Sequence, residues 1–491
     1  MGPVVVRASD LVGCRYRLRQ RLKYPEVPPL PDAVERQPLI DAARAAVFSA
    51  LPVKRALGDG SSRRFTRIDL DPSWPAESEK ATRLAMHRGA DLITHALLTG
   101  TIDGVDVVAE IDILARQGSH YLPVMISSHR VARTTEAGQE ISFIPTGRLS
   151  LGQPIAVQGR ARNHTVDGYR LALAHALLGE ASAGEGALIG QDRGRAYLVD
   201  VERKLAPLRE ALAAPVPTEP LRLKQCASCR FWPLCSPRLR ELDEVSLVYP
   251  GGRADALRER GINTVADLIE ADLGEPSTVA RAWREGIPVL KRAGGPDIPR
   301  ADVEIDVDME AYLDQGAYLW GAFDGEVYHA FVTWEEVGTQ AEEANFRAFW
   351  TWLMDVRASA HDMGKTFAAY CYAAGGENHW LKSSAERFGS VDLEDVQRFI
   401  ASDEWVDVFA YCRRNLVGTE GLGLKVLGPV AGFLWEDDNV DGERSVALRL
   451  AARGGDHNAR EMLLRYNEDD CRATRAVRDF IAAGAPGVPE I

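Results

Sequence analysis

The chain has 491 residues, of which 46% are hydrophobic and 26% are charged, and its formal net charge is −13. That length exceeds one ordinary core and predicts about two to four domains, while the lack of a bilayer-length apolar run or a signal-peptide pattern predicts a cytoplasmic protein with no membrane partner. The acidic balance excludes binding of nucleic acid by net charge alone, so any phosphate-binding surface must be a local patch.

The first 240 residues mix expected helices and strands. Apolar residues at three- and four-residue spacing predict helices over 33–57, 78–99 and 165–179. Apolar runs predict strands over 104–114 and 120–127. His95 falls on the second expected helix, where a packed role is favoured. The basic run at 14–23 is read equally well as a contact to nucleic-acid backbone or as a solvated helix face.

Three of the seven cysteines, Cys226, Cys229 and Cys235, lie within ten residues. A tetrahedral zinc site or an iron–sulfur cube needs a fourth ligand, and Cys14, about two hundred residues earlier, is the natural candidate. Ligand identity alone leaves zinc and iron–sulfur open. The other cysteines are expected to be buried free thiols: Cys371, Cys412 and Cys471.

Residues 241–298 predict a helical linker. Within it, 247–272 reads as helix, tight turn and helix, with Pro250-Gly251-Gly252 at the first turn and Gly261 before the second helix. A helix–hairpin–helix of this kind offers backbone N–H groups to a phosphate. The alternative is a plain helical connector.

From residue 302 onward the pattern changes. Strict period-two alternation predicts a strand over 302–309, followed by strands over 316–323 and 327–334 that the Asp324-Gly325 hairpin joins. A helix over 335–357, a strand over 366–373 and several helices come next. Three hairpin-connected strands, then helix, strand and helices, is the order of a ribonuclease-H-like α/β domain.

Acidic residues on these elements are candidate metal ligands. Asp308 and Glu310 are two apart on a strand, so both point to one face. Glu377 begins a helix after the strand at 366–373, and Tyr466 shares a helix face with Asp470, four residues on. Hydrolysis of a phosphodiester by two metals needs carboxylates that hold two cations about 3.5–4 Å apart. The near neighbours Asp306 and Asp469 are alternatives that differ by register.

Five pieces occur in order: VDME at 307–310, YAAGGE at 372–377, WVDVF at 405–409, GLGLK at 421–425 and YNEDD at 466–470. On these pieces, residues 302–484 resemble the tyrosine subtype of DEDD exonucleases and, more closely, the YprB-like ribonuclease-H-like domain of RecB-like nucleases. The resemblance implies that Mg²⁺ or Mn²⁺ is bound by the four acids Asp308, Glu310, Glu377 and Asp470, and that Tyr466 orders or deprotonates the water. Asp407 and Lys425 match further motif positions. Glu377 stands where the wider superfamily has aspartate.

A distant Cys14 followed by C-x2-C-x5-C resembles the iron–sulfur staple of RecB-like nucleases, which implies a [4Fe–4S] cluster on the four cysteines. Such nucleases place an acid on one strand and an acid and a lysine on the next. The strand at 104–114 supplies Glu110 and Asp112, but Met125 and Ser127 stand where the second acid and the lysine belong. The resemblance therefore implies a degenerate, inactive domain.

The predicted protein is an α/β multidomain chain in three parts. They are a degenerate RecB-type restriction-endonuclease-like domain (1–240), a helix–hairpin–helix-like linker (241–298) and a ribonuclease-H-like exonuclease domain (299–491). The predicted function is a metal-dependent nuclease with DNA or RNA as its partner; the sequence does not reveal whether it has a protein partner. The alternative is a non-catalytic nucleic-acid-binding or scaffold subunit. Convergence of the four C-terminal acids in space favours the enzyme, and divergence favours the scaffold.

Overall fold

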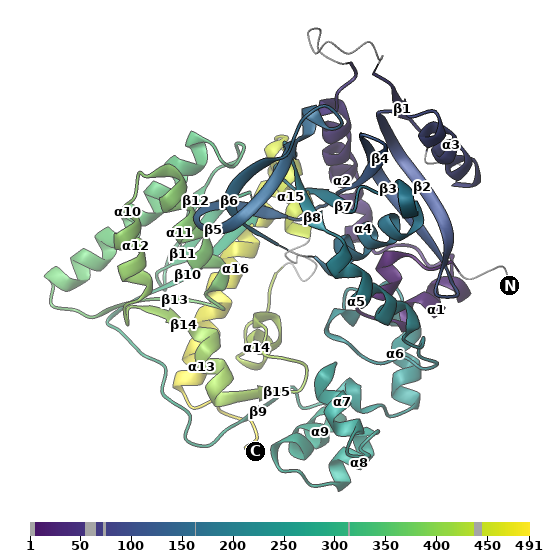
Figure 1. The fold of residues 1–491 in the computed structure, drawn as a ribbon. Helices are drawn as coiled ribbons and strands as arrows, with labels where there is room; N and C mark the ends of the chain where they lie inside the picture. Colours follow the sequence, from purple (N-terminus) through teal and green to yellow (C-terminus); the bar gives the residue numbers. More distant parts are fainter. Residues whose placement is uncertain (1–4, 55–64, 72–74, 163, 313–314, 437–443) are drawn as a thin grey trace. The chain divides into compact units, whose positions relative to one another are not determined.

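A computed structural model describes residues 5–54, 65–71, 75–162, 164–312, 315–436 and 444–491 (Figure 1). The chain forms two compact units, an N-terminal unit (Met1–Glu241) and a C-terminal unit (Leu242–Ile491). Within the described ranges, every helix is too short or too polar to cross a membrane.

The N-terminal unit is built on an eight-stranded sheet with the order β1-β2-β3-β4-β7-β8-β5-β6. Strands β2, β3 and β4 form an antiparallel meander, β7 runs parallel to β4, and β5 and β6 form an antiparallel ribbon at the edge. The strands are β1 (Arg67–Asp69), β2 (Leu92–Ile102), β3 (Val105–Gln117), β4 (His120–Ile126), β5 (Ala132–Pro145), β6 (Ile155–Ala161), β7 (Glu185–Ile189) and β8 (Arg195–Asp200). The helices are α1 (Tyr16–Lys23), α2 (Pro31–Ala50), α3 (Pro75–His87), α4 (Thr165–Leu178), α5 (Glu202–Ala213) and α6 (Trp232–Glu241).

Helices cover both faces of this sheet. The apolar helix α4 buries Leu171 and Leu173 against β2, β3 and β4 in one core. Val47 and Leu51, in and just after α2, pack in a second core against Ile113 and other strand residues. The central strands β2, β3, β4 and β7 are therefore largely buried on both sides, which agrees with their nearly continuous apolar runs.

The helix expected over 78–99 is wrong in its second half. Helix α3 ends at His87, Gly89 takes a left-handed φ of 68°, and β2 begins at Leu92. The apolar run at 92–98 satisfies a doubly buried strand as well as a helix, and periodicity alone does not separate the two. His95 thus lies on a strand, with a φ of 53°. Of the expected helix over 33–57, residues 55–57 lie outside the described ranges.

The first part of the C-terminal unit is helical. It contains α7 (Gly252–Arg258), α8 (Val265–Glu270) and α9 (Glu275–Glu285). The side chain of Thr264 caps α8, and Gly251 and Gly261 take left-handed φ values in the two turns. Strand β9 (Val289–Lys291) then pairs with β15 (Leu416–Gly418), which ties this helical part to the rest of the unit.

The rest of the unit is a five-stranded sheet with the order β12-β11-β10-β13-β14. Strands β10, β11 and β12 are antiparallel, whereas β13 and β14 run parallel to β10. The strands are β10 (Val303–Tyr312), β11 (Gly316–Phe323), β12 (Tyr328–Val332), β13 (Phe367–Cys371) and β14 (Trp405–Asp407). The helices are α10 (Gln340–Asp362), α11 (Gly375–Phe388), α12 (Leu393–Ile400), α13 (Val408–Asn415), α14 (Leu424–Val430), α15 (Arg444–Arg453) and α16 (His457–Ala482).

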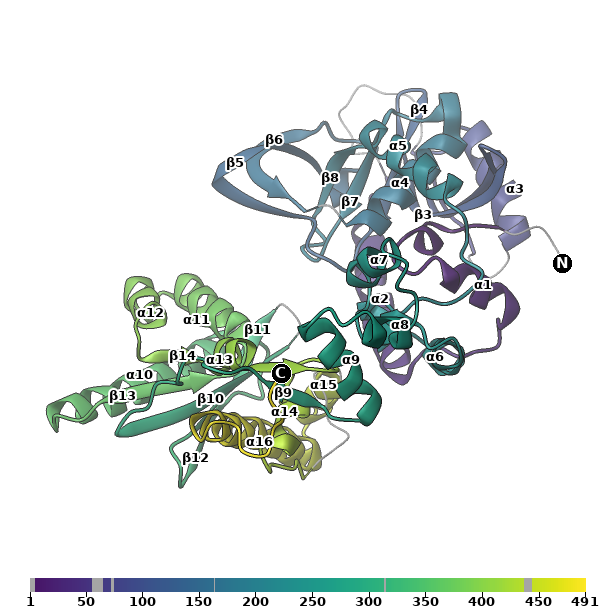
Figure 2. The ribbon, with the colours of Figure 1, turned by 90° about the horizontal axis from the view of Figure 1, so that it is seen from below.

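The two faces of this sheet have different roles. Phe346 and Phe349 of α10 pack with Trp320 in the main core on one face, together with residues of α11 and α12. The long helix α16 lies against β10 and β11 on the other face (Figure 2). The predicted order of strands and helices is confirmed, and it places the acidic side of β10 under α16.

Candidate metal centre

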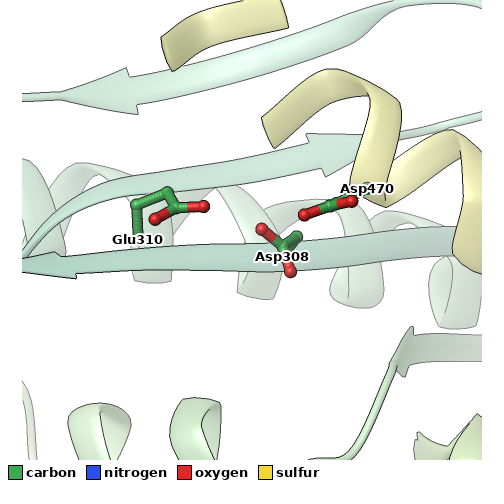
Figure 3. A group of neighbouring side chains, drawn as sticks. All are labelled: Asp308, Glu310 and Asp470. Atoms are coloured by element: carbon green, nitrogen blue, oxygen red, sulfur yellow. The ribbon is translucent and has the colours of Figure 1, made fainter. Parts of the chain in front are cut away.

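Three carboxylates meet between β10 and α16. Asp308 and Glu310 come from β10 and Asp470 comes from α16, and one oxygen of each lies within 4.8 Å of the others. Their side chains point toward one another across the gap between strand and helix (Figure 3). The two β10 residues share a face because strand side chains alternate.

Burial and mutual repulsion disfavour the ionised forms of the three acids. Burial, and then the charges of Asp470 and Glu310, raises the pKa of Asp308 well above its usual range. Burial and the charge of Asp470 raise the pKa of Glu310 to about 8. Burial raises the pKa of Asp470 to about 6, although Trp435 and Lys425 oppose the shift. Like charges that share a buried site disfavour joint ionisation unless a cation joins them.

Glu377 is the fourth predicted acid, and it does not join the group of three within 4.8 Å. It sits in the first turn of α11, is buried, and its charge raises the pKa values of both Asp308 and Glu310. Burial raises its own pKa to about 7. Its Oε2 is buried and has no hydrogen-bond partner.

These features fit a hard divalent cation. The donors are all carboxylate oxygens, the ligand type that Mg²⁺ and Mn²⁺ prefer. An orphaned buried oxygen such as Oε2 of Glu377 is a feature that an ion or its bound water would satisfy. The mutual repulsion of the acids is also relieved by positive charge between them.

A hydrogen-bonded relay fixes the orientation of Asp308. The buried amide of Asn467 donates from Nδ2 to Oδ2 of Asp308 at 2.7 Å, and the hydroxyl of Tyr328 donates to Oδ1 of Asn467 at 2.7 Å. Gly321 lies opposite Asp308 in the β10–β11 register, and a Cβ there would overlap Oδ1 of Asn467. Glycine is therefore required at this position for the relay to form.

Aromatic and basic groups surround Asp470. The indole Nε1 of Trp435 donates to Oδ1 of Asp470 at 2.8 Å. The ammonium of Lys425 lies 4.0 Å from the ring centre of Trp435 and 4.9 Å from that of Tyr466. Burial, followed by the charges of Asp470, Glu310 and Asp308, raises the pKa of Tyr466, so its phenol stays protonated in this environment.

The two neighbouring acids that differ from the predicted ligands by register have other partners. Asp306 is fully buried and forms a two-point ion pair with Arg478 of α16, at 2.7 and 3.0 Å. Asp469 accepts from the backbone N–H of Glu436 at 3.0 Å. Both carboxylates are thus engaged away from the group of three.

Asp407, the further motif acid, has a capping role. Its Oδ1 accepts from the backbone N–H of Ala410 in the first turn of α13 and from that of Ala373 after β13. Its charge also raises the pKa of Glu377, after the larger effect of burial. Asp407 therefore ties the loop that carries Glu377 to the end of β14.

In the N-terminal unit, the predicted acid is paired with arginines. Asp112 is buried, forms an ion pair with Arg44, and accepts from Nη2 of Arg170 at 2.9 Å and from the backbone N–H of Ile126 at 2.7 Å. The two guanidinium groups thus neutralise this carboxylate.

The neighbouring predicted positions do not form an acidic group with Asp112. Ser127 donates to Oδ2 of Asp167 at 2.6 Å, and Met125 is buried in the core. Glu110 is largely exposed and lies 3.8 Å from Arg7.

The four predicted cluster cysteines line one small cavity, together with Phe231 and Trp232. Burial raises the pKa values of Cys14, Cys226 and Cys235, and each of these thiols is also affected by the charge of Cys229. Two thiols receive N–H donors: Gln20 donates to Cys235 at 3.5 Å and the backbone of Leu223 to Cys226 at 3.3 Å. No three of these four described sulfur atoms lie within 4.8 Å of one another.

Comparison with known families bears on the C-terminal unit. Residues 306–482 match the RNase H superfamily. That stretch is a ribonuclease-H-like domain, a nuclease-type fold, and it contains all four predicted acids. None of the curated proteins matches the chain.

Several residues of the centre were not predicted. Asn467, Trp435 and Arg478 each donate to an acid of β10 or α16, and Tyr328 donates to Asn467. A signal existed for part of this set: buried polar residues recur at three- and four-residue spacing along α16, from Tyr466 through Asp470 and Thr474 to Arg478. Polar side chains on the inward stripe of an amphipathic helix indicate a site or an ion pair.

Proposed function

We propose that the chain is a metal-dependent nuclease that removes nucleotides from the ends of DNA or RNA through its C-terminal domain. The observation that carries this proposal is the meeting of Asp308, Glu310 and Asp470 between β10 and α16 within a ribonuclease-H-like fold. A scaffold protein has no need to bury three carboxylates together without a cation, because that arrangement is destabilising.

Each side chain of the candidate metal centre has a distinct proposed role. Mg²⁺ or Mn²⁺, when bound, supplies positive charge to activate a water and to stabilise the leaving oxygen. Asp308, Glu310 and Asp470 would hold the metal, and Glu377, which lies outside the group of three, would add a further carboxylate near it. Tyr466, whose phenol stays protonated, orients the attacking water by hydrogen bonding. This favours ordering over deprotonation.

For the N-terminal unit we propose a RecB-type restriction-endonuclease-like domain that has lost its chemistry. Its meander β2-β3-β4, followed by α4 and a parallel β7, supports that fold. The ion pairs of Asp112 with Arg44 and Arg170 support the loss, because guanidinium groups stand where a cation would be needed. The helical part at 241–298 remains a predicted helix–hairpin–helix linker.

We further propose that Cys14, Cys226, Cys229 and Cys235 hold a [4Fe–4S] cluster in a reducing compartment such as the cytoplasm. The four cysteines line one cavity, which supports a shared metal site, and the resemblance to the staple of RecB-like nucleases favours the cube over zinc. The N–H donors to Cys226 and Cys235 would stabilise thiolates.

The test is a nuclease assay on end-labelled single- and double-stranded DNA and RNA, with Mg²⁺, Mn²⁺ or chelator. We expect stepwise shortening from one end that requires the metal and is abolished in Asp308→Asn. Asp355→Asn, an exposed carboxylate on α10 with the same change of charge, is the matched control and should cleave normally. Binding without cleavage of any substrate would support the scaffold alternative and overturn the enzyme.

A further inference from the structure

The β5–β6 ribbon extends the N-terminal sheet at one edge. Only residues 143–145 of β5 pair with β8, whereas residues 132–134 and 139–143 pair with β6. Strand β6 is the last strand of the sheet, and most of its residues are exposed. Figure 2 shows the ribbon extending beyond the other strands of the sheet, and the exposed residues of β6 present their side chains to solvent.

Arginines gather on one face of this ribbon. Arg133 of β5 and Arg160 of β6 are paired directly across the two strands. Arg162 continues the ladder beyond β6, because its backbone N–H donates to the carbonyl of Val131. Side chains two apart on a strand share a face and stand about 7 Å apart, so Arg162 lies on the face of Arg160 and Arg133. All three are exposed.

Two of these arginines have no counter-ion. Among the described residues, neither Arg160 nor Arg162 forms an ion pair or a side-chain hydrogen bond. Some other exposed arginines of the same unit do have carboxylate partners: Arg83 pairs with Glu79 and Arg203 with Asp200. In a chain of net charge −13, unpaired cations side by side are a local exception.

Arg133 has an interaction partner of its own, whereas the neighbouring charges of Arg160 and Arg162 repel each other unless an anion lies between them. Like charges placed directly opposite on neighbouring strands destabilise the pair. Charged residues on an edge strand can also serve to prevent edge-to-edge association. That role needs charge on β6, but it does not explain Arg133 on the inner strand or the gathering of three arginines on a single face.

We propose that this face of the ribbon, formed by Arg133, Arg160 and Arg162, binds the phosphodiester backbone of a nucleic acid. Guanidinium groups match phosphate oxygens in two-point hydrogen bonds, and a row of them along a strand can follow successive phosphates. Binding through phosphates is independent of sequence and strongly dependent on salt. The N-terminal unit would then hold nucleic acid without cutting it. The inference rests on the proposed function only in that both require a nucleic-acid partner.

The experiment measures binding separately from cleavage. The full chain carrying Asp308→Asn is titrated against labelled single-stranded DNA and RNA, with fluorescence anisotropy read at several salt concentrations. Adding Arg160→Glu and Arg162→Glu should weaken binding at least tenfold and reduce the slope of log K against log salt by about 2. The control adds Lys80→Glu and Arg88→Glu, two other exposed cations of this unit, and should bind as the parent does.

Each outcome decides the matter. Because charge reversal could disturb the ribbon, Arg160→Gln with Arg162→Gln is measured as well, and circular dichroism verifies folding. Unchanged affinity and slope in the glutamine and glutamate variants overturn the inference, as does equal weakening by the control. If cleavage is present and the ribbon variants bind normally, only this inference fails. If ribbon-dependent binding is present and cleavage is absent, only the proposed function fails.

Discussion

The side-chain amide of Asn467 donates to Asp308 at 2.7 Å, and Tyr328 fixes the direction of that amide by donating to its oxygen. One oxygen of Asp308, Oδ2, is thereby engaged by an N–H group. An amide held in one orientation also favours the ionised carboxylate, the form that binds a metal. Asn467 is therefore a positioning residue for the candidate metal centre.

Tyr328→Phe tests this relay with little change of shape. Without the hydroxyl, the amide of Asn467 loses the partner that fixes its orientation, and Asp308 loses a dependable donor. We expect the affinity for Mn²⁺ to fall about tenfold, the lower end of the range for partners of metal ligands, with the maximal cleavage rate at saturating metal little changed. Isothermal titration with Mn²⁺ and cleavage against metal concentration measure the two effects.

Gly321→Ala acts on the same relay from β11, because its added methyl group displaces Asn467. It should reduce Mn²⁺ affinity at least as much as Tyr328→Phe does. Gly364→Ala is a control for glycine substitution at an open position, although its left-handed φ of 69° makes a small loss of stability expected. Wild-type affinity in both relay variants would show that Asn467 does not position Asp308.

The pKa values of the centre predict how metal and pH act on stability. Folding raises the pKa of Glu310 to about 8, of Glu377 to about 7 and of Asp470 to about 6. A carboxyl with a raised folded pKa contributes stability that is fully present below its unfolded pKa, near ~4, and is lost as pH rises through the folded value. The metal-free C-terminal unit should therefore lose stability between about pH 4 and 8.

Thermal unfolding at pH 5.5 and 8.5, with Mn²⁺ or chelator, measures this effect. Mn²⁺ should raise the melting temperature of the C-terminal unit more at pH 8.5, where the carboxylates are ionised, than at pH 5.5. Asp308→Asn with Glu310→Gln should abolish most of the Mn²⁺ effect and flatten the pH dependence of the chelated protein. Equal stabilisation by Mn²⁺ at both pH values would contradict an unpaired acidic centre.

The sequence could predict the C-terminal fold because its strand, turn and helix patterns agree with one another. Strict alternation over 302–309, the hairpin at Asp324-Gly325 and a long helix with an acidic pair near its middle all point to one topology. The choice of Asp308 over Asp306 could not be predicted in the same way. The two acids share a face of β10, and the residues that distinguish them are distant in sequence: Arg478 pairs with Asp306, and Asn467 donates to Asp308.

The N-terminal unit was harder to predict for a related reason. A doubly buried strand such as β2 has no polar face, so its apolar run is compatible with a helix as well as with a strand. The pairing of Asp112 with Arg44 and Arg170 links positions 68 and 58 residues apart, which no local pattern reports. Loss of the acid and the lysine at Met125 and Ser127 was readable, but the arginines that replace the cation were not.

Those arginines change what a test of Asp112 should show. Asp112→Ala removes a buried carboxylate from two guanidinium groups and from the N–H of Ile126, so it should destabilise the N-terminal unit by about 3–5 kcal/mol. Cleavage by folded protein should remain at the wild-type level, since the site of hydrolysis lies elsewhere. Urea unfolding and the nuclease assay measure the two quantities. Loss of cleavage in protein that is still folded would restore this unit as an active site.

The cysteine cluster gives the last prediction. Anaerobically purified protein should be brown, absorb broadly near ~400 nm and contain about four irons per chain. Cys14 and the other three cysteines close a loop of about two hundred residues, so metal binding there restricts the unfolded chain and adds folding free energy. Cys14→Ser should therefore lose the colour and lower the melting temperature of the N-terminal unit, while the C-terminal unit unfolds as before.

Cys412→Ala is the matched control, because Cys412 is a buried thiol of the C-terminal core outside the cluster. It should keep the full iron content and the colour, with at most a modest loss of stability in the C-terminal unit. Metal analysis separates the remaining outcomes. A colourless protein with one zinc per chain would exclude the iron–sulfur cube but retain the cross-link between the two ends of the unit. Full iron content in Cys14→Ser would exclude Cys14 as a ligand, and the cross-link with it.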